Sequence, residues 1–248
     1  MKIIDLIRHA VLSIPFAKDI HFNLSGRKVV WKYLRGDGLE VGALTNPFLV
    51  PKGVQVKYVD RMTVADLRKQ YPELEKVTLI DPDILDDGET LSSIQDSSQD
   101  FVIASHMIEH CQNPIGTIQN FLRVVKKEGI VFMAVPDKRY TFDVDRPLTS
   151  FSHLLDDYQK SPELSKYSHF KEWVDLVIST KEKVEDPEQM TEQLMNIDYS
   201  IHYHVWNPDT FKEMLTRLKS QLYFPFDIDL FVENNKGEFL VIFSTFSK

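Results

Sequence analysis

Two continuous apolar runs, one on each side of an amphipathic helix, constrain the fold of this chain most strongly. The runs are "DFVIASH", residues 100–106, and "IVFMAVP", residues 130–136. Such runs are typical of strands that are buried on both faces of a sheet. Between them, "NPIGTIQNFLRVVKKEG" predicts a complete helix that is capped by Asn113, has Pro114 in its first turn and ends at Gly129. A strand, a helix and a strand in this order predict a right-handed crossover in a parallel sheet.

The alternation continues on both sides of this unit. Upstream, further strands are predicted at residues 38–41, 54–60 and 76–81. Downstream, residues 224–246 predict two strands that are joined by a turn at 234–237. Thr63 in "TVADLRKQYP" and Asn207 in "NPDTFKEMLTRL" cap two more helices. Residues 137–205 break the rhythm, because they are polar and rich in aromatic residues and histidine. The sequence therefore predicts an α/β fold, with a seven-stranded, mostly parallel sheet, a C-terminal antiparallel hairpin and a helical insertion at 137–205 after the fifth strand.

A single domain over residues 1–248 accounts for the length of the chain. Residues 1–35 predict an N-terminal helical segment, and because Asp5 and Arg8 interrupt its apolar pattern, neither a secretion signal nor a membrane span is expected. The only cysteine, Cys111, excludes an intrachain disulfide and favours the cytoplasm. The net charge of −8 argues against a nucleic-acid partner.

The stretch "GLEVGALTNPF", residues 38–48, has the form of the first strand and turn of a nucleotide-binding unit. Dinucleotide-binding turns carry the glycines of G-x-G-x-x-G, and only Gly42 is present here. In open α/β sheets, ligands bind beyond the carboxyl ends of the strands. Asp60 ends a strand 18 residues after Gly42, near the spacing of about 20 for an acid that binds ribose hydroxyls. The spacing alone leaves ribose binding and an ordinary strand end both open.

Several longer motifs point to a known family. They are "LEVGALTNPF", "VKYVDR", "DDGETL", "HYHVWNPDTF" and, most specifically, residues 100–147, where "D-x-V-x-x-x-x-x-x-E-H" precedes "L-R-V-x-K-x-x-G". With these motifs, residues 38–150 and 200–246 resemble the class I S-adenosylmethionine-dependent methyltransferases, in particular the type 11-like subgroup associated with glycan assembly. The resemblance implies a Rossmann-like fold and S-adenosylmethionine as the cofactor.

The resemblance also implies roles for single residues. Glu40, Gly42 and Ala43 would begin the cofactor loop, Asp60 and Arg61 would lie at the ribose, Asp87 and Gly88 near the adenine, and Ser105 and His106 beside the sulfonium. The chain departs from the pattern at Leu44, where a second glycine is usual, and Pro47 leaves little room for a helix after the first strand. S-adenosylmethionine has no pyrophosphate, so the missing glycines argue against a dinucleotide and not against this cofactor.

A hydroxyl acceptor would need a general base, and histidine is the residue type suited to that role. His106 and His204 are the first candidates for a catalytic residue, and Asp137 is the third. Each has a structural alternative: His106 contacts only the cofactor, His204 packs in the interior, and Asp137 pairs with Arg139 or Arg146 within its loop.

Two histidine spacings raise the question of a metal. His106-Met-Ile-Glu109-His110 fits the H-x-x-E-H zinc pattern, but His106 directly follows a buried strand, so the helix which that chemistry needs is not expected. His202 and His204 could lie on one side of a strand, where a packed or substrate-facing pair is favoured over a metal pair. No metal site is predicted.

The sequence thus predicts an S-adenosylmethionine-dependent methyltransferase that O-methylates a sugar, a glycan or another small polar acceptor and associates with glycosyltransferases. One alternative is a non-catalytic scaffold or partner protein in glycan assembly. A second alternative, an NAD-dependent oxidoreductase, is disfavoured by the missing glycines.

Overall fold

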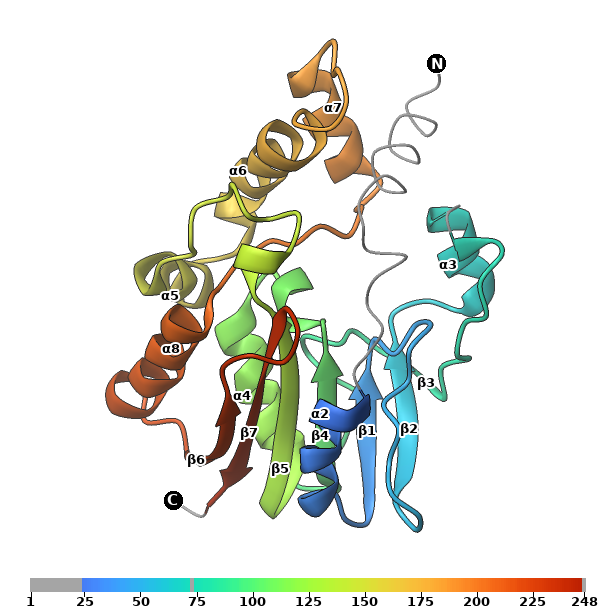
Figure 1. Ribbon diagram of the computed structural model, residues 1–248, viewed down its shortest axis with the longest axis vertical. Coiled ribbons are helices and arrows are strands. Elements are labelled where there is room, and N and C mark those ends of the chain that lie inside the picture. Colours follow the sequence, from blue (N-terminus) through green and yellow to red (C-terminus); the bar gives the residue numbers. More distant parts are fainter. Residues whose placement is uncertain (1–23, 72–73, 247–248) are drawn as a thin grey trace.

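The computed structural model describes residues 24–71 and 74–246, which form a seven-stranded sheet in the order β3-β2-β1-β4-β5-β7-β6 (Figure 1). The strands are β1 (Asp37–Val41), β2 (Gln55–Asp60), β3 (Ile84–Leu85), β4 (Gln99–Ser105), β5 (Val125–Pro136), β6 (Phe226–Val232) and β7 (Glu238–Thr245). The pairs from β3 to β5 are parallel, whereas β7 is antiparallel to both β5 and β6. The predicted mostly parallel sheet with a terminal hairpin is confirmed.

Apolar side chains cover both faces of the central strands. Val102 of β4 and Met133 of β5 pack with α4 (Pro114–Val124) and α8 (Pro208–Gln221) on one face. Ile103 and Phe132 of the same strands face the opposite side. This alternation of two apolar faces explains why β4 and β5 appear in the sequence as continuous hydrophobic runs.

The chain between β1 and β2 supplies no crossover helix to cover the sheet face that bears Ile103 and Phe132. Residues 42–54 are all described and form no helix, as Pro47 predicted. In its place, α2 (Leu24–Arg27) and the short helix η2 (Lys28–Lys32) lie over the sheet, as Figure 1 shows. Phe48 packs on Phe132 with a ring distance of 5.1 Å. The loop after β1 therefore forms part of the hydrophobic core.

Two predicted boundaries are wrong. Residues 76–81 are not a strand, and β3 is only Ile84–Leu85, because the chain first crosses to the end of β1, where Ile80 N donates to Leu44 O over 2.8 Å. The helix α4 ends at Val124 and not near Gly129, and β5 starts at Val125. At this start, the register between β4 and β5 is irregular between Gln99 and Phe101. There, Thr245 Oγ1 donates to the carbonyl of Lys126 over 2.7 Å. These tertiary contacts outweigh the helical sequence pattern.

The helix caps agree with the predictions from sequence. Thr63 accepts from Asp66 N at the start of α3 (Val64–Gln70), and Asn113 accepts from Gly116 N at the start of α4. Asn207 and Thr210 form a reciprocal capping box at the start of α8. At the N-terminus, residues 24–32 are helical, and the predicted helix before residue 24 lies outside the described residues.

The insertion contains the predicted helices. They are α5 (Phe151–Gln159), α6 (Glu163–Trp173), the π-helical turn η6 (Val174–Ile178) and α7 (Pro187–Asn196). Figure 1 shows α6 and α7 standing beyond the carboxyl ends of the strands. Phe170, Trp173 and Leu194 build a hydrophobic cluster separate from the clusters on the sheet. Within the described part of the chain, none of the helices has the length and apolar character that crossing a bilayer requires.

Candidate functional site

The ends of β1 and β4 and the loop after β3 meet at one edge of the sheet. Gly42 follows β1 with φ +70°, a left-handed conformation that favours glycine. A Cβ on Gly88 would lie 2.6 Å from Val41 Cγ1 and 2.8 Å from Met107 Cε, so only glycine lets these segments pack together. The structure thus brings Gly42, Gly88 and Met107 in the turn after β4 to one place.

Glu40 points into the loop after β1. Its side chain is completely buried, and both carboxylate oxygens lie 2.9 Å from Phe48 N, which donates to them. Burial raises the pKa of Glu40 to about 7, although the hydrogen bond from Phe48 opposes this shift. Ala43 supports the same loop, because its carbonyl accepts from Asn46 N over 2.9 Å. Glu40 therefore holds the Asn46-Pro47 turn against the sheet.

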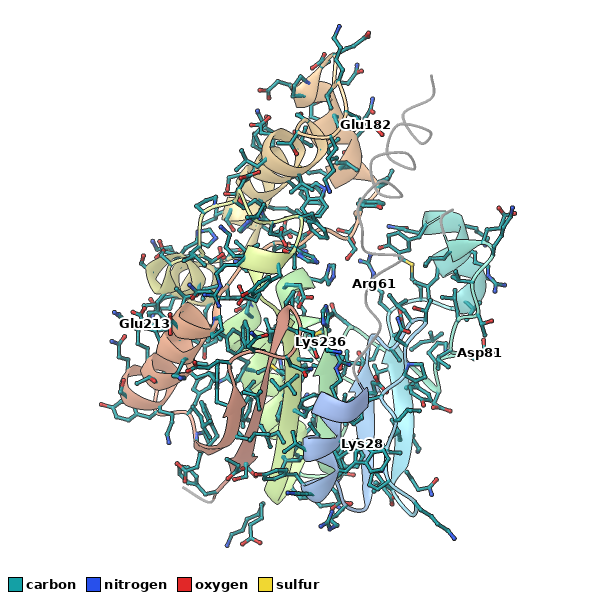
Figure 2. The ribbon with its side chains drawn as sticks, in the orientation of Figure 1. Lys28, Arg61, Asp81, Glu182, Glu213 and Lys236 are labelled. Atoms are coloured by element: carbon teal, nitrogen blue, oxygen red, sulfur yellow. The ribbon has the colours of Figure 1, made fainter. Side chains whose placement is uncertain are left out.

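Two neighbours at the end of β2 act on different parts of the molecule. Asp60 is partly buried, its Oδ1 accepts from Met62 N over 3.2 Å, and burial raises its pKa. Arg61 turns toward the insertion, where it donates to Asp198 over 2.6 Å and to the Tyr71 hydroxyl over 2.8 Å. Figure 2 shows Arg61 between the sheet and the insertion. Asp60 is thus placed for a ligand at the strand ends, whereas Arg61 holds two segments of the protein together.

The loop after β3 is ordered by its own acids. Asp87 Oδ1 accepts from Glu89 N over 2.7 Å and tightens the turn around Gly88. Glu89, which sequence reasoning did not select, accepts from Gln112 N over 2.7 Å and from Asn113 N over 2.9 Å. Glu89 is the fourth residue of "DDGET" and follows the predicted residues Asp87 and Gly88. This position was the signal in the sequence that could have found it. Glu89 thus fixes the loop after β3 to the start of α4.

His106 is the predicted residue with the most specific environment. It follows β4 in a left-handed conformation with φ 51°, and its Nε2 lies 2.7 Å from Glu238 Oε2. Arg27 also donates to Glu238, with Nε at 2.8 Å from Oε1 and a second contact through Nη2. Burial opposes ionisation of Glu238, but the hydrogen bonds from Arg27 and His106 lower its pKa to about 2. Glu238 is therefore a fixed negative charge that orients the His106 ring. The predicted residue Ser105 also contacts Arg27, because its Oγ lies 3.4 Å from Arg27 Nη1.

Glu109 lies on the other side of the His106 ring. Its side chain is 1% exposed, its Oε1 lies 3.8 Å from His106 Nδ1, and burial raises its pKa. Within the described residues, neither carboxylate oxygen has a hydrogen-bond partner. Buried carboxylates without partners are rare and are typical of functional sites. Sequence reasoning met Glu109 in the family motif and in the rejected zinc pattern but gave it no role, and it had no signal for Glu238 or Arg27.

The other two catalytic candidates lie elsewhere. Asp137 is buried after β5 and accepts from Arg139 Nε over 3.0 Å and Arg139 Nη2 over 2.6 Å, which is the alternative that the sequence left open. His204 is completely buried among other histidines, and its Nε2 lies 3.3 Å from the Gln112 carbonyl. Arg139 holds Asp137, and other histidines surround His204, so protein groups other than the His106–Glu238 pair hold both residues, and a catalytic role for either stays a prediction.

A family model described as a methyltransferase domain matches residues 24–218. No curated protein matches the sequence. The CurJ carbon methyltransferase is similar at 15% identity and a TM-score of 0.48, over 91% of this chain and 54% of that one. A SAM-dependent methyltransferase from Aquifex aeolicus is similar at 12% identity and a TM-score of 0.45, over 90% of each chain. A protein from Rhodobacter sphaeroides named among the "Putative Zn-dependent Alcohol Dehydrogenases" is similar at 17% identity and a TM-score of 0.52, over 99% of this chain and 97% of that one.

This chain thus spans about half the length of the CurJ protein. The likeness to the Rhodobacter sphaeroides structure, at 17% identity, shows a shared fold alone.

Proposed function

Because this chain belongs to the methyltransferase-domain family and uses S-adenosylmethionine as its cofactor, we propose that it methylates a hydroxyl group of a sugar, a glycan or another small polar acceptor. The observation that carries the choice of a hydroxyl is the His106–Glu238 pair at the end of β4. A neutral hydroxyl is a weak nucleophile until a base accepts its proton, whereas many other acceptors need no such base.

The residues at the strand ends fit a cationic cofactor. Burial raises the pKa of Asp60 and Glu109, and a cation bound beside these carboxyls would favour their ionised forms. S-adenosylmethionine carries an ammonium and a sulfonium, and when bound it supplies a methyl group on that positively charged sulfur. The glycine at position 42, in its left-handed conformation beside Met107, leaves the backbone open to close approach.

Each residue at this edge has one proposed task. Asp60 accepts hydrogen bonds from both ribose hydroxyls, and Gly88 and Asp87 line the adenine side. Glu40 does not touch the cofactor and instead keeps the loop after β1 in place through Phe48. Ser105 and His106 lie nearest to the reacting methyl group. The acceptor is aligned beside them, and the insertion excludes water.

In this proposal His106 is the general base. Glu238 accepts the hydrogen bond from Nε2–H over 2.7 Å, which orients the ring. His106 would accept the proton of the acceptor hydroxyl, while bound S-adenosylmethionine would supply the methyl group to the hydroxyl oxygen and leave as S-adenosylhomocysteine. The charge of Glu238, whose pKa is lowered to about 2 by the hydrogen bonds from Arg27 and His106, stabilises the resulting imidazolium. Glu238 is a positioning residue, because it acts through His106.

Two features support a polar, sugar-like acceptor. The loop after β5 carries Tyr140, whose side chain is 63% exposed and lies beside Gly237, in the hairpin that brings Glu238 to the site. Exposed aromatic rings with a polar end suit contacts to polar ligands. The resemblance to the glycan-assembly subgroup supports the same acceptor and an association with glycosyltransferases, and the single cysteine supports a cytoplasmic location.

The test is methyl transfer from S-adenosylmethionine to sets of sugars and oligosaccharides, amines and carbon acids. We expect turnover with a hydroxyl acceptor, and about 100-fold lower kcat in His106→Gln, since general bases contribute about 10²–10⁴-fold. Glu238→Gln should shift the lower limb of the pH–rate profile, and the affinity for S-adenosylhomocysteine should be retained in both variants. Preferential methylation of amines or carbon acids, or full turnover in His106→Gln, would exclude the proposal.

A further inference from the structure

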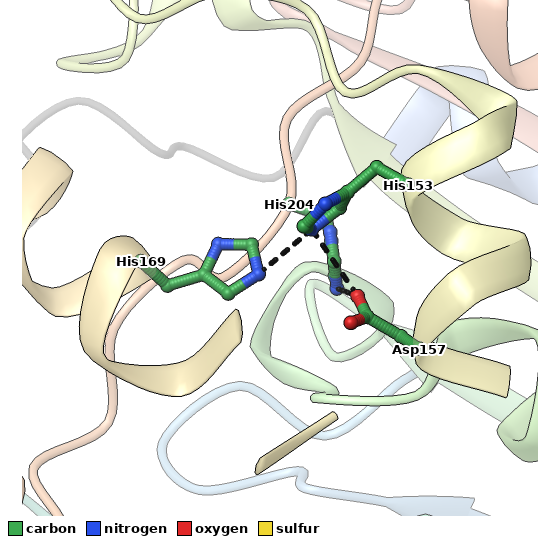
Figure 3. Close-up of side chains that lie close together, drawn as sticks. All are labelled: His153, Asp157, His169 and His204. Atoms are coloured by element: carbon green, nitrogen blue, oxygen red, sulfur yellow. Dashed lines mark hydrogen bonds and ion pairs between the residues drawn. The ribbon is translucent and has the colours of Figure 1, made fainter. Parts of the chain in front are cut away.

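Four side chains of the insertion converge in the interior of the protein. They are His153 and Asp157 of α5, His169 of α6 and His204, and together they are named here the buried histidine cluster (Figure 3). One ring nitrogen of each histidine and one oxygen of Asp157 all lie within 4.8 Å of one another. Three separate segments of the chain thus direct their polar atoms at one point.

The distances within the cluster match a shared cation. His153 Nε2 lies 3.0 Å from His169 Nε2 and 3.2 Å from Asp157 Oδ2, and His204 Nε2 lies 3.8 Å from the same oxygen. In a tetrahedral zinc site with bonds of about 2.0–2.1 Å, neighbouring ligand atoms lie about 3.3 Å apart. The three distances of 3.0, 3.2 and 3.8 Å each lie within about 0.5 Å of that spacing.

Hydrogen bonds alone do not satisfy these atoms. His153 Nε2 can carry one hydrogen, and that hydrogen cannot point well at both His169 Nε2 and Asp157 Oδ2. Asp157 Oδ2 and His204 Nδ1 are buried and have no hydrogen-bond partner in the described ranges. Because unpartnered buried polar atoms are costly, the cluster lacks a group that a cation would supply.

The protonation states also suit a metal. His169 and His204 are both buried, and burial favours the neutral form of an imidazole, which keeps a lone pair. A neutral imidazole is the form that binds a metal ion. His153 is the most accessible member, with a side chain that is 34% exposed, and it gives an ion a path to the cluster.

The groups behind the cluster hold its members in place. Ser165 Oγ donates to Asp157 Oδ1 over 2.6 Å, which leaves Oδ2 directed at the histidines. The backbone of Tyr203 hydrogen-bonds to His169, and the Gln112 carbonyl lies 3.3 Å from His204 Nε2. Carbonyl and hydroxyl partners of this kind orient the ligands of metal sites.

From this geometry we propose that the buried histidine cluster binds one divalent transition-metal ion, of which zinc fits best. Three imidazoles and one carboxylate form a donor set that suits zinc more than magnesium or calcium. Four protein ligands close the coordination shell, so the ion is structural and takes no part in methyl transfer. It fastens α5 and α6 to the segment before α8, whose Tyr203 N donates to the Glu109 carbonyl over 2.8 Å.

The first test is the titration of metal-free full-length protein, without a histidine tag, with Zn²⁺ in a calorimeter. We expect one equivalent to bind and, at a 100-fold excess over Kd, to raise Tm by about 5–10 °C. Co²⁺ in place of Zn²⁺ should give visible absorption bands of the intensity typical of tetrahedral coordination. Folded metal-free protein, verified by circular dichroism, that binds no Zn²⁺ would overturn the proposal.

Variants then identify the ligands. His153→Ala, at the exposed side of the cluster, and Asp157→Asn should each weaken Zn²⁺ binding by more than the about 10–100-fold that follows loss of an outer partner. His110→Gln is the matched control, because His110 belongs to a second group with Glu109 and His202. Binding that survives in His153→Ala and Asp157→Asn but is lost in His110→Gln would place the ion in that second group and refute the assignment. Neither result depends on the methyl acceptor.

Discussion

Glu40 is completely buried, and this makes the stability of the protein depend on pH. Its pKa is about 7 in the folded state against 4.5 as the ordinary value, so the folded chain binds more protons between these values. The contribution of Glu40 to the free energy of unfolding is therefore fully present below pH 4.5 and is lost as the pH rises through about 7. The shift corresponds to at most about 3 kcal/mol.

The prediction is that Glu40→Gln flattens this dependence. Urea unfolding of wild type and variant between pH 4.5 and about 7 measures it, because only the wild type carries a carboxyl that loses its proton in that window. Parallel stability curves for the two proteins over that range would show that Glu40 titrates normally in the fold.

Asp60 is predicted to carry most of the recognition of the ribose. Removing a charged acceptor of two hydrogen bonds costs about 1.5–3 kcal/mol for each bond, so Asp60→Ala should lower the affinity for S-adenosylhomocysteine by at least about 100-fold. Isothermal calorimetry measures the dissociation constant. Asp66→Ala is the control, since Asp66 pairs with Lys69 at the surface of α3. Equal affinity in both variants and wild type would remove the ribose role from Asp60.

At the residue scale, the sequence predicted the residues that directly end a strand and missed those that reach the site from afar. His106 could be selected because it follows a buried apolar run. Glu238 is 132 positions away and comes beside His106 only because β7 pairs with β5. Arg27 reaches Glu238 from a helix packed on the sheet. No local pattern encodes such distances, because they result from tertiary packing.

At the element scale, the start of α8 makes a measurable contribution to stability. Asn207 accepts from Thr210 N over 2.9 Å, and Thr210 Oγ1 accepts from Asn207 N over 3.2 Å. Asn207→Ala should lower the free energy of unfolding by about 1 kcal/mol, within the 0.5–2 kcal/mol typical of lost caps. Thr216→Ala, on the exposed part of the same helix, is the control and should cost less, as urea denaturation can measure. A larger loss in the control would contradict the assignment.

Helix starts were predicted better than helix ends and short strands. An Asn followed by Pro fixes the first turn through local hydrogen bonds, so the starts of α4 and α8 could be found in the sequence. The end of α4 depends on the sheet, because Lys126 bonds to Asp100 over 2.7 Å and its carbonyl accepts from Thr245. A two-residue strand such as β3 is too short to have a hydrophobic period of its own.

On the scale of the whole molecule, the cofactor should stabilise the fold. A ligand that binds only the folded state at 100 times its Kd adds about 2.7 kcal/mol, which corresponds to a rise in Tm of about 5–10 °C. We expect this shift in thermal unfolding with S-adenosylmethionine and S-adenosylhomocysteine, and none with NAD. A shift with NAD alone would contradict the cofactor, and no shift with any of the three would favour the scaffold alternative.

The insertion should open more readily than the sheet. Its cluster around Phe170, Trp173 and Leu194 is separate from the clusters that cover β4 and β5. Native-state hydrogen exchange should therefore give lower opening free energies for amides of α6 and α7 than for those of β4 and β5. Added Zn²⁺ should slow exchange in α6, where His169 lies. Equal protection of all four elements would show one cooperative unit.

The alternation of strands and helices predicted the topology of the sheet, since parallel strands and their crossovers leave a strong pattern. The packing of the insertion could not be predicted, because His153, His169 and His204 are spread over 52 positions and meet only in three dimensions. The prediction that the chain has no metal site rested on histidines that are close in sequence, such as His202 and His204.

The position of β7 between β5 and β6 has a consequence for synthesis on the ribosome. About 100 residues separate Pro136 at the end of β5 from Glu238 at the start of β7, and at about 5–20 residues per second they take about 5–20 s to be made. Throughout that interval, one edge of β5 has no strand to pair with, and its apolar residues Val131 and Phe132 lack part of their cover. Nascent chains on crowded polysomes are therefore most exposed to aggregation after β5 has emerged, and chaperones that bind extended apolar segments would act at this stage.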